Sequence, residues 1–431
     1  MTLVVEVISK ETINPGSPIP DHLNPYQLSF LDQLAPSVFS PLVLFFPRDC
    51  TTEPKNTTPY SDQLKKSLSQ TLTIYYPLSG HLRGNNYVDC SLETGVPYVV
   101  TQVKCHLAEL VENSVPDELH KLLPFELDHE GNDHLLGVQY NLFECGGIVL
   151  GICLSHKVGD ASSLFSFIKT WGAIARGEGE VPPLEFVSAA LFPPVDISGF
   201  SPRTGITKEN VVAKRLVFNA DSIESLRSKL ATSPALRDQP APTRVETLSA
   251  FMWTRFVAAT KVESSTTKTY FLLHAVNFRT RMNPPLPENA FGNFYRVATT
   301  FPSTEPYEDH LGDIVSQVRN SIRKVDGEEV KKLQKGKEYL GFMKEQSGRF
   351  IRGETVALNF TSLCRFPLYD ADFGWGKPLL VGTPSLSFCN LVIFMDTASG
   401  DGVEALVHLK EEDMDKMMED QELLQYVQAL K

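Results

Sequence analysis

The pentapeptide at residues 156–160, His-Lys-Val-Gly-Asp, constrains the fold more than any other feature of the chain. The apolar run before it, residues 147–154, is short, β-branched and bounded by glycines, which is typical of a buried strand. The residues after it carry apolar side chains at spacings that repeat on one face of a helix: Leu164, Phe165, Phe167, Ile168 and Trp171. The sequence therefore predicts a strand, a turn at the pentapeptide, and a helix over about 160–176.

His156 and Asp160 occupy different places in this predicted unit. His156 stands at the end of a strand, where irregular backbone can aim a side chain into a cleft. Asp160 stands where a helix N-cap belongs, since its carboxylate can accept hydrogen bonds from the N–H groups of the first turn. The two side chains then need not face each other. The position predicts chemistry for His156 and a structural role for Asp160, although a histidine is more often a surface or core residue than a base.

The bulk properties describe a globular α/β protein. A length of 431 residues predicts two or three domains, and 42% hydrophobic with 21% charged residues is ordinary for such a fold. A net charge of −12 argues against binding nucleic acid over a broad surface. The seven cysteines show no metal-ligand spacing, which favours reduced thiols in a cytoplasmic protein and no metal site. We expect neither a secretory signal nor a membrane span.

The strand and helix patterns divide the chain into two series. The first series contains expected strands at 3–7, 41–46, 98–103, 135–142 and 147–154, and a helix from an N-cap at Ser61. Periodicity fails between about 193 and 210, where Pro, Ser and Gly are frequent. The second series has expected strands at 211–218, 269–278, 355–360, 386–395 and 403–409. Capping-box spacing occurs at Asp221/Glu224 and Thr243/Glu246. Alternation is imperfect, which favours mixed sheets.

Residues 372–376, Asp-Phe-Gly-Trp-Gly, form a second distinctive stretch. Two glycines flank one of three tryptophans, so the backbone turns tightly or approaches another group closely. The acid at the start of such a turn more often pins the loop by hydrogen bonds than acts in catalysis. A structural turn with Trp375 in the core is the favoured interpretation.

A third stretch, residues 277–285, carries Arg279 and Arg281 at the end of an apolar strand. Alternate residues of a strand point the same way, so both arginines are expected to share a face with Asn277. A buried arginine needs a carboxylate partner, and Asp160 and Asp372 are the candidates. Two solvated surface arginines are an equally good interpretation of the residues alone.

Phosphate-binding G-x-x-x-x-G-K-[ST], G-x-G-x-x-G, H-E-x-x-H and G-x-S-x-G motifs do not occur in the sequence. Taken together, the segments that do occur resemble the BAHD family of plant CoA-dependent acyltransferases. The likeness lies in the His-x-x-x-Asp motif at His156 and Asp160, the motif at 372–376, and further segments in the same order: residues 28–32, 76–80, 277–281, 291–293 and 399–404. Residues 281–287 and 395–397 are most similar to the branch that contains vinorine synthase and other alkaloid O-acetyltransferases. Ala161, Ala290 and Leu363 depart from common family residues.

The resemblance implies an α/β fold of two similar-sized domains, each a mixed β-sheet covered by helices as in chloramphenicol acetyltransferase, with an active-site channel between the domains. The implied domains are 1–195, which carries the His motif, and 211–431, joined by a crossover loop at 196–210. A segment near 365–395 is expected to complete the first domain's sheet.

The resemblance also implies the roles of the site residues. His156 is the general base for direct attack of an alcohol or amine on the acyl-CoA thioester in a ternary complex, without an acyl-enzyme. Asp160, Arg279, Arg281, Asp372, Gly374, Trp375 and Gly376 are structural, and Asp372, Phe373, Gly374 and Trp375 are expected to shape the CoA channel. The Trp375 indole is one candidate for holding the oxyanion.

The implied activity is transfer of an acetyl group from acetyl-CoA to a hydroxyl of a plant specialised metabolite such as an alkaloid. No permanent cofactor, no metal and no nucleic-acid or membrane partner is expected, and the protein is expected to be a cytoplasmic monomer. Three alternatives stay open. They are N-acyl or malonyl transfer, a carrier-protein-dependent condensation domain, which usually has a second His where Ser155 stands here, and a non-catalytic binding protein.

Overall fold

A computed structural model describes residues 2–48, 58–91, 95–112, 115–127, 132–179, 181–200, 210–261, 268–305 and 309–428. By its internal contacts the chain divides into two units. The first contains Met1–Pro202, Leu286–Phe294 and Phe366–Ser385, and the second contains Arg203–Pro285, Tyr295–Arg365 and Leu386–Lys431. Most of the crossover loop expected at 196–210, namely residues 201–209, lies outside the described residues.

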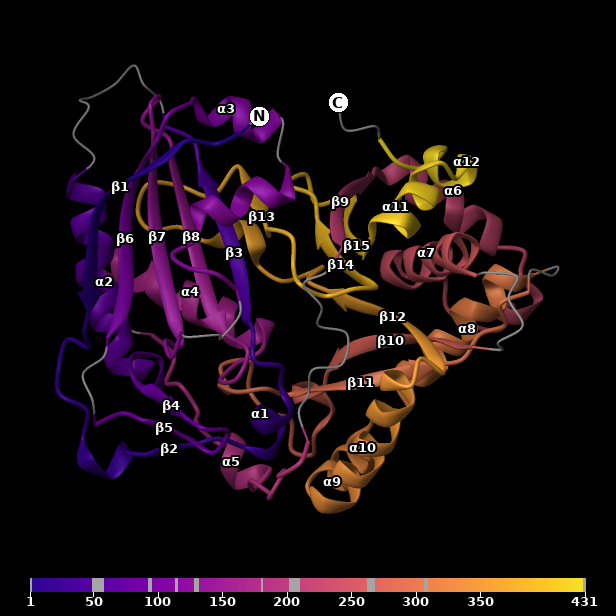
Figure 1. The fold of residues 1–431 in the computed structure, drawn as a ribbon, viewed down its shortest axis with the longest axis horizontal. Helices are drawn as coiled ribbons and strands as arrows, with labels where there is room; N and C mark the ends of the chain where they lie inside the picture. Colours follow the sequence, from indigo (N-terminus) through magenta and orange to yellow (C-terminus); the bar gives the residue numbers. More distant parts are fainter. Residues whose placement is uncertain are drawn as a thin grey trace. The chain divides into compact units, whose positions relative to one another are not determined.

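The first unit is built on a mixed six-stranded sheet (Figure 1). Its order is β1 (Val5–Ile13), β6 (Val96–Val103), β7 (Leu136–Phe143), β8 (Ile148–Ser155), β3 (Phe39–Phe46) and β13 (Leu380–Gly382). Strands β6 and β7 are parallel, and the other neighbours are antiparallel. The last strand, β13, comes from far along the chain and pairs Leu380 with Phe45.

Burial explains which strands the sequence reveals. Strand β8 is buried along its whole length and β3 along nearly all of it, so both are continuous apolar runs, as predicted for 147–154 and 41–46. Strand β1 was expected to end at residue 7 but continues to Ile13. It lies at the edge of the sheet and exposes most of its side chains, so its polar second half gives no hydrophobic signal.

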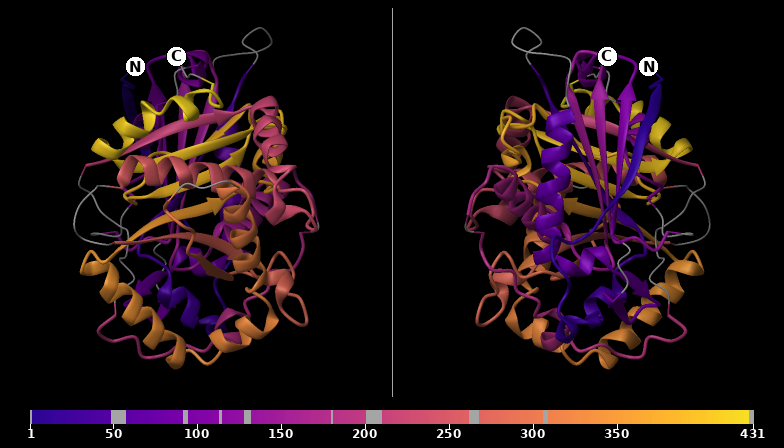
Figure 2. Two further views of the ribbon diagram at one scale, coloured as in Figure 1. Left: turned by 90° about the vertical axis from the view of Figure 1, so that its right-hand side faces the viewer. Right: turned by 90° about the vertical axis from the view of Figure 1, so that its left-hand side faces the viewer.

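Two long helices of the first unit, α2 (Thr58–Ile74) and α4 (Ala161–Ala175), pack against each other (Figures 1 and 2). The Trp171 indole Nε1 of α4 donates to Ser67 Oγ of α2 at 3.0 Å. The remaining α-helices and strands of the unit are short. They are α1 (Phe30–Leu34), α3 (Leu107–Glu112), α5 (Ser188–Leu191), and a small antiparallel sheet of β2 (Tyr26–Gln27), β5 (Tyr87–Asp89) and β4 (His81–Arg83).

The second unit also holds a mixed six-stranded sheet. Its order is β11 (Tyr295–Thr300), β10 (Thr269–Asn277), β12 (Thr355–Ser362), β14 (Leu391–Asp396), β15 (Val403–Lys410) and β9 (Val211–Phe218). Strands β10, β12 and β14 are parallel to one another. The expected strand at 386–395 begins only at Leu391, because Asn390 adopts a positive φ of 58° that extended structure does not allow.

The helices of the second unit are α6 (Ala220–Leu230), α7 (Arg244–Thr260), α8 (His310–Arg323), α9 (Gly327–Leu333), α10 (Lys337–Ile351), α11 (Glu411–Met418) and α12 (Gln421–Leu424). Helix α7 packs against α6, α8, α11 and strand β12, and its apolar face lies in the core of the unit. Each unit therefore combines a mixed sheet with packed helices, which confirms the predicted fold class.

Two capping predictions have different outcomes. The Thr243/Glu246 capping box is present at the start of α7, where Thr243 Oγ1 accepts from Glu246 N and Glu246 accepts from Thr243 N. The expected box at Asp221 and Glu224 is wrong. Helix α6 begins at Ala220, so its N-cap is Asn219, whose side chain accepts from Ser222 N at 2.7 Å.

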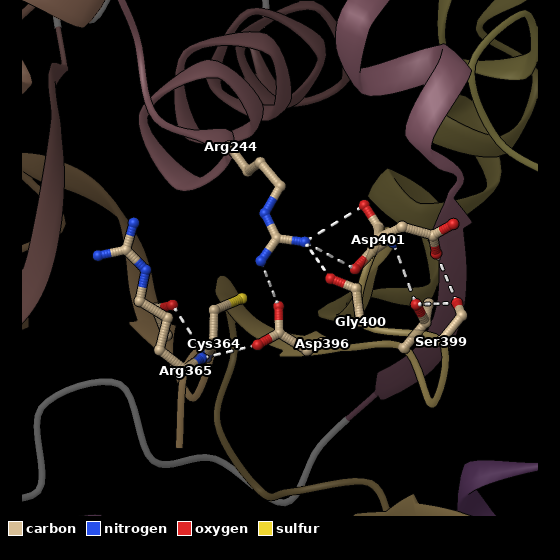
Figure 3. A network of polar contacts seen from close by, with 10 residues as sticks. Arg244, Cys364, Arg365, Asp396, Ser399, Gly400 and Asp401 are labelled. Carbon is tan, nitrogen blue, oxygen red and sulfur yellow. Dashed lines mark hydrogen bonds and ion pairs between the residues drawn. The ribbon is translucent and has the colours of Figure 1, made fainter. Parts of the chain in front are cut away.

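The segment at 396–402 is held by an arginine of α7 (Figure 3). Arg244 donates to Asp396 Oδ1 at 2.8 Å and to the backbone carbonyls of Gly400, Asp401 and Gly402. The other oxygen of Asp396 accepts from Arg365 N at 2.7 Å. This network ties the β14–β15 hairpin to the first turn of α7 and to the end of β12.

None of the helices that the structure describes is long and apolar enough to cross a lipid bilayer. Among the same residues no group of three His, Cys, Asp or Glu side chains comes together as a metal site requires.

A buried ion pair gives the first testable prediction. Arg319 of α8 forms two hydrogen bonds of 2.9 Å with Glu246 of α7, and the two side chains are only 6% and 13% exposed. We expect Arg319→Met to lower the free energy of unfolding of this unit by about 3–5 kcal/mol, because Glu246 is left charged and buried. Thermal unfolding followed by circular dichroism measures the change.

The matched control is Lys331→Met. Lys331 pairs with Glu328 on the surface, where the two side chains are 64% and 77% exposed. Solvent screens such a pair, so we expect no measurable change. Equal melting temperatures for the two variants would contradict a stabilising role for the Arg319–Glu246 pair.

Candidate active site

His156 follows directly after the last residue of β8. Its backbone N donates to the carbonyl of Val38 at 2.9 Å, just before β3, so the sheet fixes where the side chain starts. A tight turn follows, in which Val158 N donates to Ser155 O, and helix α4 then begins at Ala161. The strand, turn and helix predicted around the pentapeptide are confirmed.

The ring of His156 is oriented by Asn293, a residue 137 positions away in sequence. His156 Nδ1 lies 3.0 Å from Asn293 Oδ1. The amide nitrogen of Asn293 donates to the His156 carbonyl at 2.9 Å and to Asp32 Oδ1 at 2.9 Å, and both of these groups only accept in this arrangement. The amide is therefore locked with its oxygen toward the ring. In the neutral imidazole the proton is on Nδ1, and the lone pair is on Nε2.

The environment favours the neutral form of this imidazole. Burial lowers the pKa of His156 below its usual value, although Asp160 and the hydrogen bond with Asn293 act in the opposite direction. A neutral imidazole with a defined tautomer is the form that can accept a proton near pH 7. The arrangement can therefore act as a general base at Nε2.

Asp160 caps α4, as its position in the sequence predicts. Its Oδ1 accepts from Ser163 N at 3.0 Å and from Ser163 Oγ at 3.2 Å. Its Oδ2 accepts from Phe294 N at 2.9 Å. Asp160 thus joins the start of α4 to the loop that carries Asn293, while the hydrogen bond to the histidine ring at Nδ1 is made by Asn293.

The loop at 291–294 needs glycine at its second position. Gly292 has a φ of +136°, and a Cβ there would lie 2.9 Å from Ser188 Cβ. Its N–H and its carbonyl both bond with Ser163 Oγ, at 3.1 and 2.9 Å. Asp160 N also donates to the Gly292 carbonyl at 3.3 Å, so the loop is fixed to the start of α4 by hydrogen bonds with both Asp160 and Ser163.

The expected strand geometry of Arg279 and Arg281 is wrong. Strand β10 ends at Asn277, and residues 279–281 form a 3-10 turn, because Asn277 Oδ1 accepts from Arg279 N at 3.0 Å and draws the chain out of the sheet. Arg281 donates to the carbonyls of Ile322 and Val325 at 2.6 and 2.9 Å, at the end of α8. Arg279 is buried, and its pairing with Asp160 stays a prediction.

Residues 372–376 form a turn that is closed by hydrogen bonds between its own residues. Asp372 Oδ1 accepts from Gly374 N at 2.8 Å and from Gly376 N at 3.0 Å. Both glycines have a φ of about +104°, where other residues are strained. The turn lies against α4: Arg176 donates to the Asp372 carbonyl, and a Cβ at Gly172 would lie 2.6 Å from that oxygen.

Trp375 and Phe373 belong to an aromatic cluster. The Trp375 ring lies 5.2 Å from Tyr60 and 6.1 Å from Phe46, and Phe373 lies 4.9 Å from Trp171, between ring centroids. Phe46 pairs with Ile148 at one end of β8, whereas His156 follows the other end. Eight residues of strand separate these ends by about 23 Å. The Trp375 indole therefore lies near the end of β8 opposite to His156, which disfavours it as the candidate for holding the oxyanion.

Sequence reasoning missed the role of Asn293 and of Asp32. Both residues lie in segments that the family resemblance includes, 291–293 and 28–32, but nothing in either segment alone indicates a contact with His156. Asp32 and Asn293 are 261 residues apart. The available signal in the sequence was a polar residue, Asn293, directly after a glycine in a segment that fits no standard turn type. That signal was weak.

Known proteins are similar to this chain over nearly its whole length. The sequence matches the Transferase family over residues 3–424. It is 36% identical over 423 residues to stemmadenine O-acetyltransferase of Catharanthus roseus, with 96% of each chain covered. It is 37% identical over 428 residues to a limonoid 21-O-acetyltransferase of Melia azedarach, with 98% of each covered.

Solved structures share the fold. The crystal structure of vinorine synthase superposes with a TM-score of 0.83 at 34% identity and covers 98% of each chain. A structure of F. graminearum TRI101 complexed with coenzyme A and T-2 mycotoxin has a TM-score of 0.76 at 16% identity, with 94% of this chain and 100% of that chain covered.

Fold and relatives together define an acyltransferase that transfers groups other than aminoacyl groups. The chain belongs to the Transferase family, that is, the BAHD family of plant acyltransferases, as its motifs predict.

The contacts of Asp160 give the second testable prediction. Asp160→Ala removes the cap of α4, at a cost of about 1 kcal/mol. It also leaves the buried Phe294 N–H without its acceptor, at a cost of about 1–3 kcal/mol. We expect a lower melting temperature together with lower acyl transfer, because the loop that carries Asn293 loosens. Thermal unfolding and turnover of the same sample measure both effects.

The matched control for this prediction is Asp326→Ala. Asp326 caps α9 through Glu328 N and Glu329 N at 3.0 Å each, on the surface of the second unit. The cap is lost there, at about 1 kcal/mol, together with the attraction between Asp326 and the Arg281 guanidinium, but no hydrogen bond to the loop that carries Asn293 is lost. An Asp160→Ala protein as stable and active as this control would overturn the role that we assign to Asp160.

Proposed function

We propose that the protein transfers an acetyl group from acetyl-CoA to a hydroxyl group of a plant specialised metabolite such as an alkaloid, with His156 as the general base. The single observation that carries this mechanism is the hydrogen bond between His156 Nδ1 and Asn293 Oδ1, which leaves the lone pair of the neutral ring on Nε2. A base of this kind is what attack of an alcohol on a thioester requires.

The reaction proceeds in a ternary complex without an acyl-enzyme. His156 Nε2 takes the proton of the acceptor hydroxyl as its oxygen attacks the thioester carbonyl. The tetrahedral intermediate then collapses, the C–S bond breaks, and the thiolate of CoA leaves and receives the proton from the imidazolium. No permanent cofactor and no metal takes part in this scheme.

The other site residues are assigned structural roles. Asp160 and Arg279 hold the histidine turn in place, Arg281 secures the end of α8, and Asp372, Phe373, Gly374, Trp375 and Gly376 shape the CoA channel away from the reacting atoms. The domain assignment of 1–195 and 211–431, joined by a crossover loop at 196–210, belongs to the same proposal. We expect a cytoplasmic monomer.

The acceptor class is drawn from the names of the relatives. One similar enzyme is named for an alkaloid, stemmadenine, and another for limonoids, and both are named O-acetyltransferases. A bulky, largely apolar alcohol fits both names. Pockets for such ligands are mainly apolar with few polar groups, so His156 is expected to be the main polar contact at the reacting oxygen.

The third testable prediction concerns the base. His156→Ala should keep the fold, because Asn293 retains its bond to Asp32, and should lower turnover about 10²–10⁴-fold or more. Release of free CoA, followed with a thiol reagent, measures turnover, and circular dichroism checks the fold. Near-native turnover by a folded His156→Ala protein would refute the assignment. His310→Ala, a change at a partly exposed histidine at the start of α8 in the second unit, is the control and should keep full turnover.

The fourth prediction concerns donor and acceptor. Incubation with acetyl-, malonyl- and aromatic acyl-CoA against a panel of alkaloid and terpenoid alcohols, a polyamine and shikimate should give acetyl esters of the apolar alcohols. Mass spectrometry identifies the products. Preference for the polyamine or shikimate would overturn the acceptor class, and preference for malonyl-CoA would overturn the donor. Turnover only with a carrier-bound acyl group would favour the condensation-type alternative.

A further inference from the structure

Asp32 is a buried carboxylate that the mechanism above does not use. It lies in α1 and is 0% exposed. Burying a charged carboxylate is very costly unless hydrogen bonds compensate it. In this chain it accepts four: from Ser29 N at 2.9 Å, Ser29 Oγ at 2.7 Å, Asn293 N at 3.1 Å and Asn293 Nδ2 at 2.9 Å.

This hydrogen-bond pattern fits the ionised form. Three of the four partners are N–H groups that can only donate, so a proton on Asp32 would have only Ser29 Oγ as an acceptor. Burial raises the pKa of Asp32, while the bonds from Ser29 and Asn293 favour the charged form. Two of the three N–H groups that donate to Asp32 belong to Asn293. The buried negative charge therefore lies directly against that residue.

The chain of hydrogen bonds continues from Asp32 to the histidine ring. Asn293 Nδ2 donates to Asp32 Oδ1, and Asn293 Oδ1 receives the Nδ1–H of His156. A negative charge at the nitrogen end of an amide increases the electron density on its oxygen, and linked hydrogen bonds strengthen one another. The imidazolium formed when His156 takes a proton is therefore stabilised through Asn293.

A second contact attaches α1 to the same turn. Lys157 is buried, and its Nζ donates to the carbonyls of Gln33 and Ala35 at 2.9 Å each, at the end of α1. Helix α1 therefore touches the residues on both sides of the ring: Asn293 through Asp32, and the backbone next to His156 through Lys157.

We propose that Asp32 is a positioning residue for the general base: it fixes and polarises the Asn293 amide, which holds His156 in the Nδ1–H tautomer and makes Nε2 more basic. The proposal rests on the proposed role of His156. Asp32 does not touch the reacting atoms, and it acts only through Asn293.

The test is Asp32→Asn, which keeps the shape of the side chain and removes its charge. We expect kcat to fall about 10–100-fold with KM for acetyl-CoA unchanged. Losses of this size are typical when a residue that orients a functional side chain through a hydrogen bond is removed. The acid limb of kcat/KM against pH should move to lower pH, because the imidazolium loses stabilisation. Asp420→Asn, a change at the capping aspartate of α12 in the second unit, is the matched control and should leave both quantities unchanged.

The direction of the pH shift separates the effect of the Asp32 charge on His156 from its opposite, indirect effect through Lys157. Asp160 favours the protonated ring, and Lys157 opposes it. Burial lowers the pKa of Lys157 to about 7, and Asp32 partly counters this. Loss of Asp32 would therefore make Lys157 less charged, which would raise the pKa of His156. A shift of the acid limb to lower pH shows that loss of the Asp32 charge outweighs the change at Lys157, and the double-mutant cycle then separates its action through Asn293 from direct electrostatic attraction. A shift to higher pH would overturn the proposal.

A double-mutant cycle shows whether Asp32 acts through Asn293. If it does, Asp32→Asn adds no further loss of kcat to Asn293→Ala, because the link is already cut. Fully additive losses would overturn the proposal. Should Asp32→Asn not fold, as judged by circular dichroism, Asp32→Ser replaces it in the same cycle, since it also removes the charge and leaves an acceptor oxygen.

Nitrogen NMR of histidine-labelled protein keeps this inference separate from the proposed function. It reports the pKa and tautomer of His156 without substrate. A lower His156 pKa and a smaller Nδ1–H population in Asp32→Asn support the proposal even if His156→Ala proves active. Unchanged His156 signals overturn it, even if His156→Ala is inactive and the general-base assignment stands.

Discussion

Two buried carboxylates accept hydrogen bonds from the loop at 291–294 of the first unit, and the geometry around His156 depends on these bonds. Asp32 accepts from the backbone N–H of Asn293, and Asp160 accepts from that of Phe294. Each carboxylate also belongs to the first turn of a helix: Asp160 is the N-cap of α4, and Asp32 completes the capping box of α1 with the N-cap residue Ser29. Because a buried charge is tolerated only with donors in place, neither helix can shift without breaking the bonds to the loop. The ring of the histidine is thereby oriented by backbone as much as by side chains.

The sequence reveals those parts of this arrangement that are local. A strand, a turn and a helix around His156, and the cap at Asp160, follow from residue spacing within about twenty positions. The contact of Asp32 with Asn293 spans 261 positions and leaves no periodic trace. The second half of the edge strand β1 and the three-residue strand β13 give no sequence signal for a related reason: β1 exposes most of its side chains, and β13 is too short to show a period.

The errors made from sequence have local physical causes as well. The apolar run before Arg279 and Arg281 predicts a strand through both residues, but a hydrogen bond from Arg279 N to the Asn277 side chain turns the backbone first. Trp375 was considered for the oxyanion because it stands in a family motif. The register of β3 and β8 puts its neighbour Phe46 and the histidine at opposite ends of the same strands. Motif membership thus indicated that a residue matters without indicating where it acts.

The first unit is not continuous in sequence, and this bears on how the chain is made. Its sheet is completed by β13 at Leu380–Gly382, and the amide that orients His156 arrives with Leu286–Phe294. A nascent chain that has emerged from the ribosome only as far as Pro202 has the histidine but neither the edge strand nor Asn293. During synthesis the buried carboxylate of Asp32 would lack two of its four donors until residue 293 has been added. We therefore expect helix α1 to dock against the rest of the first unit late, after the second sheet has begun to form.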